Sequence, residues 1–121
     1  MLRIIETDAG EAVGIKLGRV GGLSVARRIR DLCMEAGIRT NIWDTGGTAL
    51  QASAVVHRAQ TTPEPLRRAT WICYDRLPCN PVEGGVVNGD GWAVAGDGPG
   101  IGAHPDEAAL GDPTAVHTLD S

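Results

Sequence analysis

Short apolar segments alternate with amphipathic segments in the first part of the chain. The apolar segments span residues 12–17, 39–43 and 68–74, and each has the length of a buried strand. Between them, residues 24–36 and 48–60 carry apolar side chains at helical spacing. Strand–helix–strand–helix–strand with short connections predicts right-handed crossovers and a parallel sheet, and therefore an α/β fold.

The ends of both predicted helices carry the usual signals. We expect Ser24 and Thr48 to cap their first turns, because short hydroxyl side chains accept hydrogen bonds from free N–H groups there. Gly37 follows the first helix as a stop signal. Pro63 follows the second, and proline cannot extend the helical hydrogen-bond ladder.

Glycine becomes frequent after residue 75. Eight glycines occur among the nineteen residues 84–102, and residues 86–94 predict two short strands around an Asn-Gly-Asp-Gly turn. Residues 98–103 fit a G-x-G-x-x-A pattern, but Pro99 interrupts it, no buried strand precedes it and no periodic helix follows. We therefore predict an ordered loop rather than a nucleotide-binding turn.

The polar face of the first predicted helix is rich in arginine. It carries Arg27, Arg28, Arg30, Asp31 and Glu35. Arg27 and Asp31 are four residues apart and can pair on the helix surface. We expect a solvated face with internal ion pairs rather than a phosphate-binding patch.

Composition narrows the functional classes. The chain has 121 residues, a length typical of one domain, and its 42% hydrophobic and 21% charged residues describe a globular protein. Fifteen acidic and eleven basic residues give a net charge of −4, which argues against a nucleic-acid or anionic-membrane partner. No apolar run approaches the ~20 residues of a membrane span, and no signal-peptide pattern opens the sequence, so we expect a cytoplasmic protein.

Cysteine and histidine do not form a metal-binding pattern. Cys33, Cys73 and Cys79 are odd in number and contain no C-x-x-C motif, so neither a disulfide framework nor a zinc site is indicated. His57, His104 and His117 lack metal-ligand spacing. We expect no metal ligands from this chain.

Several segments, taken together, resemble the C-terminal part of the mandelate racemase/muconate lactonizing enzyme family of the enolase superfamily. The matching features are Gly-Ile-Lys-Leu-Gly-Arg-Val-Gly-Gly-Leu at residues 14–23, the arginine-rich helix, the strand before Asp44, the helix with His57, and Pro-Gly-Ile-Gly at residues 99–102. Residues 41–48 and 68–75 are most similar to family members that act on hydroxyproline and proline betaine derivatives, in particular those of the cis-3-hydroxy-L-proline dehydratase type.

The resemblance implies the C-terminal portion of a (β/α)7β barrel, with residues 12–17, 39–43 and 69–73 as its sixth to eighth strands. Residues 1–78 would be a partial barrel, and residues 79–121 a glycine-rich extension that packs on a separate capping domain. A complete barrel takes about 250 residues. The resemblance therefore also implies that the family's magnesium-binding carboxylates, its second-strand lysine and the capping domain lie outside this sequence.

Lys16, the single lysine beside ten arginines, matches the family's sixth-strand lysine. The resemblance implies that it acts as a general acid/base on the proton alpha to the substrate carboxylate. Nearby positive charge from a metal ion and a second lysine favours the neutral amine that a base requires, and it also stabilises the enediolate. Arginine could not replace it, because a guanidinium stays protonated at all relevant pH values.

Asp44 and Trp71 are candidate substrate contacts. Asp44 lies at a strand end, where its carboxylate could meet a substrate ammonium or hydroxyl, or could serve only the Thr-Gly-Gly turn that follows. The indole of Trp71 could lie against the cationic ring nitrogen of a proline-like substrate, or could be core. Strand alternation would turn Cys73 the same way as Trp71, and Ile72 toward the helices.

The resemblance implies a fragment of a magnesium-dependent enzyme that takes the alpha proton from a small proline-like carboxylate, as a dehydratase of the cis-3-hydroxy-L-proline type. Two alternatives stay open: a racemase or epimerase of the same family, and a non-catalytic module that pairs its exposed first strand with an N-terminal partner. We expect the isolated chain to be inactive. We also expect it to self-associate or to pair with the N-terminal half, because an apolar face would be uncovered.

Overall fold

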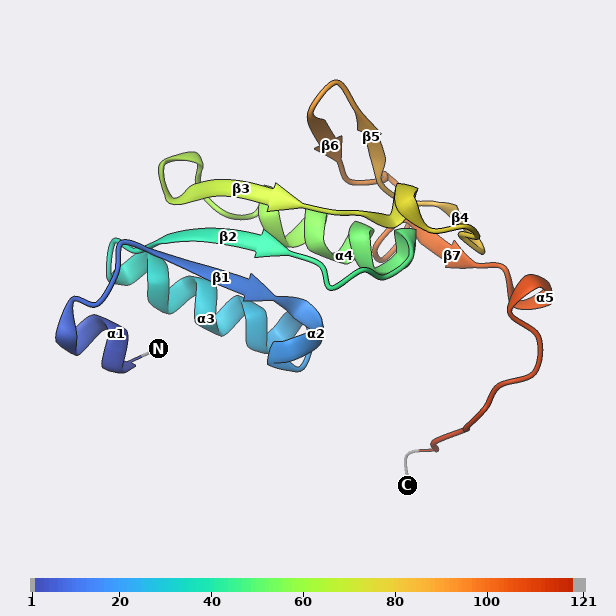
Figure 1. Ribbon diagram of the computed structural model, residues 1–121, viewed down its shortest axis with the longest axis horizontal. Helices are drawn as coiled ribbons and strands as arrows, with labels where there is room; N and C mark the ends of the chain where they lie inside the picture. Colours follow the sequence, from blue (N-terminus) through green and yellow to red (C-terminus); the bar gives the residue numbers. More distant parts are fainter. Residues whose placement is uncertain (1, 119–121) are drawn as a thin grey trace.

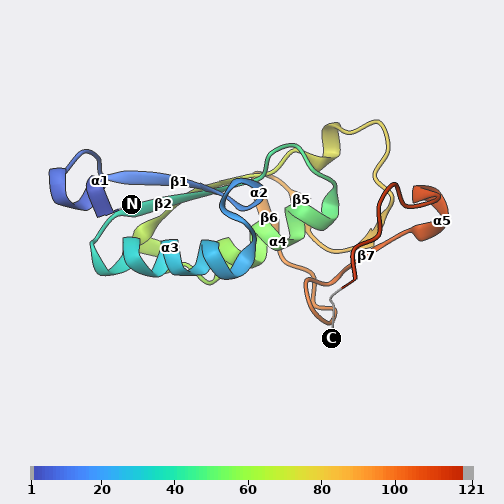
Figure 2. The same ribbon diagram turned by 90° about the horizontal axis from the view of Figure 1, so that it is seen from below.

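The structure is a computed structural model that describes residues 2–118. Its first part is a three-stranded parallel sheet with two long helices on one face (Figures 1 and 2). The sheet contains β1 (Ala12–Lys16), β2 (Arg39–Trp43) and β3 (Arg67–Trp71), in that order, and the helices are α3 (Leu23–Glu35) and α4 (Ala49–Gln60). The predicted α/β fold with a parallel sheet is confirmed.

The second part is built from short antiparallel pairs. β4 (Val82–Gly84) pairs with β7 (Ala103–Pro105), and β5 (Val87–Gly89) pairs with β6 (Trp92–Val94) across the predicted Asn-Gly-Asp-Gly turn. Figure 1 shows the β5–β6 hairpin projecting away from the body of the molecule. The remaining elements, which the hydrophobic pattern does not predict, are α1 (Leu2–Thr7), α2 (Leu17–Val20), η1 (Glu64–Leu66), η2 (Tyr74–Arg76) and α5 (Glu107–Leu110).

The core lies between the sheet and the two helices. Ile15 and Ile42 are neighbours in the parallel register, and both are fully buried against α3 and α4. Each buried isoleucine stabilises the fold by about 1.5–3 kcal/mol relative to an exposed one. Because side chains alternate along a strand, Lys16 and Trp43 point to the opposite face, which no helix covers along β1 and β2 in the described chain (Figure 2).

Two predicted strands end earlier than expected. β1 ends at Lys16 because Leu17 already begins α2. β3 ends at Trp71 rather than at residue 74. Beyond Trp71, the N–H group of Cys73 donates to the Asp44 carboxylate at 3.1 Å instead of to a strand carbonyl, and η2 follows.

The helix ends correct both predictions of side-chain capping and confirm where α4 begins and where α3 stops. The N-cap of α3 is Gly22, not Ser24, and its φ of 104° is a conformation that favours glycine. Gly37 stops this helix with a φ of 66°, as predicted. α4 follows Thr48 as predicted, but the Thr48 side chain makes no capping bond, and the side chain of Asn80 accepts from the Ala49 N–H at 2.8 Å instead.

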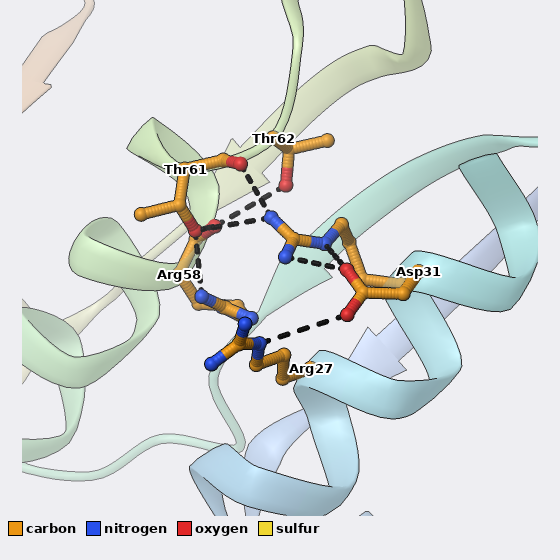
Figure 3. A network of polar contacts seen from close by, with 6 residues as sticks. Arg27, Asp31, Arg58, Thr61 and Thr62 are labelled. Atoms are coloured by element: carbon orange, nitrogen blue, oxygen red, sulfur yellow. Dashed lines mark hydrogen bonds and ion pairs between the residues drawn. The ribbon is translucent and has the colours of Figure 1, made fainter.

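The helical pattern predicts that Arg30 lies on a solvated face, and this prediction is wrong. Arg30 is buried, with 7% of its surface exposed. Its guanidinium donates to the carbonyl of Thr61, just beyond α4, and pairs with Asp31 at 2.5 Å. The last carbonyls of a helix lack partners within the helix and carry partial negative charge, so a cation is favourable there. The predicted ion pair between Arg27 and Asp31 is present at 3.6 Å (Figure 3).

The glycine-rich segment packs on α4 through a small apolar cluster of Ala52, Val56 and Val86 and through polar side chains of that helix. The hydrogen bonds join Val86 N–H to Ser53 Oγ at 2.9 Å, Ala95 N–H to Gln60 Oε1 at 2.6 Å, and His57 Nε2 to the Ile101 carbonyl at 3.2 Å. Residues 96–102 form the predicted loop, without helix or strand. Packing of this segment on a capping domain stays a prediction.

Candidate functional site

Parallel strands end at a common edge of the sheet, and three side chains form a row there. Lys16, Trp43 and Trp71 are the last residues of β1, β2 and β3. The strand register pairs Lys16 with Trp43 and Trp43 with Trp71. We call these three residues the strand-end row. It lies on the sheet face opposite α3 and α4.

Lys16 sits against an aromatic face. Its Nζ atom lies 5.4 Å from the centroid of the Trp43 ring, within the range of a cation–π contact. The side chain is half-buried, and none of the ion pairs found among residues 2–118 includes it. Its amine is therefore positioned by an indole and not by a carboxylate.

Trp71 continues the row toward solvent. Its ring centroid lies 6.3 Å from that of Trp43, and the two planes meet at 66° in an edge-to-face arrangement. Trp71 is 48% exposed, which leaves part of its ring available to another molecule. Its role in substrate binding stays a prediction.

Trp43 is the member of the row that the residue-by-residue reading missed. Its position in the sequence could have identified it. Trp43 and Lys16 each lie at the end of a predicted strand, and the register of parallel strands places such residues side by side. Its indole N–H is buried and has no hydrogen-bond acceptor among the residues that the structure describes.

Asp44 directly follows the last residue of β2 and is completely buried. One carboxylate oxygen accepts from the Gly46 N–H at 3.0 Å and from the Cys73 thiol at 3.3 Å, and the other accepts from the Cys73 N–H at 3.1 Å. The backbone N–H of Asp44 donates to the Trp71 carbonyl at 3.1 Å. Asp44 therefore serves the turn and joins the ends of β2 and β3, while its contact with substrate stays a prediction.

Cys73 remains a thiol in this arrangement. Partial burial, followed by the hydrogen bond to Asp44 and the negative charge of that carboxylate, raises the pKa of Cys73. Only the protonated thiol can donate to the Asp44 carboxylate, so this hydrogen bond favours the thiol over the thiolate of Cys73.

Metal ligands are not grouped in the described chain. Among residues 2–118, no three His, Cys, Asp or Glu side chains lie close enough together to hold a metal ion. Asp44, the carboxylate beside the strand-end row, already accepts N–H and S–H groups. Magnesium requires several oxygen ligands at once, and this donor set does not fit it.

No helix in the described part is long and apolar enough to cross a membrane.

Comparison with known proteins shows the family to which this chain belongs. The profile of the Enolase C-terminal domain-like family matches residues 1–109. The chain is 32% identical over 118 residues to cis-3-hydroxy-L-proline dehydratase from Roseibium aggregatum. That alignment covers 98% of this chain and 32% of the dehydratase, so the chain spans about a third of its relative's length.

Two solved structures have the same arrangement of elements. A member of the enolase superfamily from Roseovarius nubinhibens, complexed with magnesium, superposes with a TM-score of 0.88 at 43% identity, over 94% of this chain and 31% of that one. A mandelate racemase/muconate lactonizing enzyme from the same organism superposes with a TM-score of 0.89 at 32% identity, over 94% and 31% of the two chains.

Proposed function

Because this chain belongs to the Enolase C-terminal domain-like family of the enolase superfamily, we propose that it supplies one acid/base arm of an enzyme acting alpha to a carboxylate. The observation that carries the proposal is the position of Lys16, at the end of β1 on the uncovered sheet face, with its amine 5.4 Å from the Trp43 ring centroid. The chain covers only about a third of the length of the dehydratase, so the remaining groups of the site would come from another part of the protein.

The proposed chemistry is a proton transfer at Lys16 Nζ. As the neutral amine, it takes the proton on the carbon next to the substrate carboxylate, and as the ammonium it returns one. A well-placed acid or base of this kind accelerates a reaction by about 10²–10⁴-fold. The Trp43 ring limits where the amine can reach, which supports a defined direction of attack.

The proposed substrate is a small, proline-like carboxylate. The exposed part of Trp71 supports this, because an indole face attracts the cationic nitrogen of such a ring. The similarity to cis-3-hydroxy-L-proline dehydratase favours loss of water, and racemisation or epimerisation at the same carbon is the alternative. Asp44 would act on substrate indirectly, because its hydrogen bonds to Trp71 and Cys73 position the end of β3. It would bind substrate directly if its carboxylate gave up the hydrogen bonds from Cys73.

The proposal includes a magnesium ion, which would bind the substrate carboxylate in the whole enzyme. A similar solved structure is complexed with magnesium. Residues 2–118 contain no cluster of three His, Cys, Asp or Glu side chains that could hold a metal ion, so the magnesium ligands would come from outside the described chain.

The test replaces the matching third of the Roseibium dehydratase with residues 1–109 of this chain. Exchange of the alpha proton of cis-3-hydroxy-L-proline in D₂O is followed by NMR, and Lys16→Ala should slow it by about 10²–10⁴-fold. Lys16→Arg should not restore exchange, because guanidinium does not deprotonate. Arg19→Gln, which removes an exposed cation three residues away, is the matched control and should keep normal exchange.

Two results would contradict the proposal. Lys16→Ala with unchanged exchange would remove Lys16 from the chemistry, and equal losses in Lys16→Ala and Arg19→Gln would indicate a general charge effect. The 121-residue chain alone, with magnesium and the same substrate, should give no product above background.

The uncovered sheet supports a second proposal, that this chain pairs with the N-terminal part of the enzyme. In the described part, β1 and β3 each pair with β2 alone and so leave one edge free. The free edge of β3 borders a groove of about 700 Å³, lined by Trp71 on one side and by Trp92 of the β5–β6 hairpin on the other. Open strand edges beside apolar side chains favour pairing with another chain.

Sedimentation of the chain alone and mixed with the preceding two thirds of the Roseibium dehydratase tests this pairing. The chain alone should self-associate at micromolar concentrations, and the mixture should give a one-to-one complex. A stable monomer that ignores the added segment would contradict the proposal.

A further inference from the structure

A second polar site lies on the helix-covered side of the sheet, away from the strand-end row. A shallow pocket of about 280 Å³ opens between the first turns of α3 and the last turn of α4. Its lining includes Ser24, Arg27, His57, Arg58 and Thr61. Figure 3 shows Arg27 from α3 and Arg58 from α4 converging on the same space.

The arginine cluster around this pocket has more positive than negative charge. It contains three guanidinium groups, of Arg27, Arg30 and Arg58, and one carboxylate, of Asp31. Asp31 contacts Arg30 at 2.5 Å and Arg27 at 3.6 Å. None of the ion pairs found in residues 2–118 includes Arg58. Two positive charges are left without a counterion in the cluster.

Arg58 is incompletely bonded. Its Nη2 donates to the Thr61 hydroxyl at 2.6 Å, but its Nε and Nη1 atoms are buried and have no acceptor within residues 2–118. Desolvation, followed by the positive charge of Arg30 and, more weakly, of Arg27, lowers the pKa of Arg58, and Asp31 opposes this shift. A buried charged donor without an acceptor is costly, and an added anion would remove that cost.

Two further features favour an anion here. The first turn of α3 borders the pocket through Leu23 and Ser24, and its N-cap, Gly22, has no side chain to accept the free N–H groups. The side chain of Arg27 is 70% exposed, so it can swing outward and give a ligand access to the covered donors of Arg58. His57 is already bonded to the Ile101 carbonyl through Nε2.

We propose that this pocket binds a phosphate-type dianion between Arg27, Arg58 and the first turn of α3. Two uncompensated charges match a dianion, and guanidinium groups bind phosphate oxygens in paired, charge-assisted hydrogen bonds. The site lies across the sheet from Lys16, so its occupation is independent of the proposed proton transfer.

The experiment is a titration of the full chain with inorganic phosphate at constant ionic strength. The side-chain Nε–H signals of arginine are followed by ¹H–¹⁵N NMR, with chloride as the reference salt. The signals of Arg27 and Arg58 should shift to saturation, and Arg27→Gln should raise the half-saturating phosphate concentration at least about tenfold, as expected for loss of one charge-assisted contact. Arg28→Gln removes an equal charge from an exposed neighbour on α3 and should change it less than about twofold.

A second measurement does not depend on resolved NMR signals. Phosphate at one hundred times its dissociation constant should raise the folding equilibrium constant about 100-fold in urea unfolding. Arg58→Lys, which keeps the charge but not the paired donors, should weaken this effect. Shifts that do not saturate, no phosphate effect on unfolding, or equal losses in Arg27→Gln and Arg28→Gln would each overturn the proposal.

Discussion

In the α/β layer, Ile15, Ile42 and Val55 are completely buried, whereas in the glycine-rich segment Val87, Trp92 and Val94 are largely exposed. The layer is held by side chains packed between the sheet and two helices. The segment of residues 82–105 is held by hydrogen bonds to α4, by a small apolar cluster in which Val86 packs on Ala52 and Val56, and by glycines that bring backbone close to backbone. A mutation should therefore affect the layer mainly through lost side-chain volume, and the segment mainly through steric clashes at its glycines or through lost hydrogen bonds.

The largest expected effect is in the layer. Ile42→Ala leaves a cavity between β2 and the helices, and we expect it to lower the free energy of unfolding by about 2–5 kcal/mol. Urea unfolding followed by circular dichroism measures the change. Val87→Ala is the control in the glycine-rich segment and should change stability by less than about 0.5 kcal/mol. Equal effects of the two substitutions would remove the contrast between the regions.

An intermediate effect is expected where the glycine-rich segment meets α4. Gly85 has a φ of +89°, and a Cβ atom there would lie 2.4 Å from Ser53 Oγ and 2.9 Å from Ala103 Cβ. Gly85→Ala should therefore destabilise the chain by about 1–3 kcal/mol through strain and overpacking.

Gly89→Ala is the matched control for this contact, because a Cβ atom at Gly89 meets nothing within 4 Å. Its urea midpoint should stay near that of the unmodified chain. If Gly85→Ala were equally mild, the close approach of the Gly85 backbone to the Ser53 side chain would not be what holds the segment on α4.

The smallest effect is expected at the junction of β2 and β3, and it depends on pH. The pKa of Cys73 is raised in the folded state, so its contribution to stability is present below the ordinary thiol pKa of about 8.5 and is lost as pH rises through the raised value. Unfolding measured between pH 7 and 10 should show this loss, and Cys73→Ala should reduce it. Cys79→Ala, which removes an exposed thiol, should leave the pH dependence as it was. An unchanged profile in Cys73→Ala would show that the Asp44 contact does not stabilise the fold.

The candidate site was only partly visible in the sequence. Lys16 is identified through the Gly-Ile-Lys-Leu motif and the glycines that follow it, a local pattern that needs no knowledge of neighbours in space. Trp43 could not be identified in this way, because its contact with Lys16 depends on the register of two strands separated by α3. The buried role of Arg30 depends similarly on the position of the carbonyl of Thr61, thirty-one residues away along the chain.

Local chemistry in the sequence was sufficient to determine the α/β order, both long helices, the stop at Gly37 and the ion pair of Arg27 with Asp31. These features depend on periodicity, on backbone conformation and on residues within one helical turn. Only the tertiary structure decided that Asp44 closes the end of β3, that Arg58 has buried donors with no acceptor in the described part of the chain, and that Trp43 lies beneath the Lys16 amine. Each of these features depends on groups from different elements, and the packing of the sheet against the helices sets the distances between them.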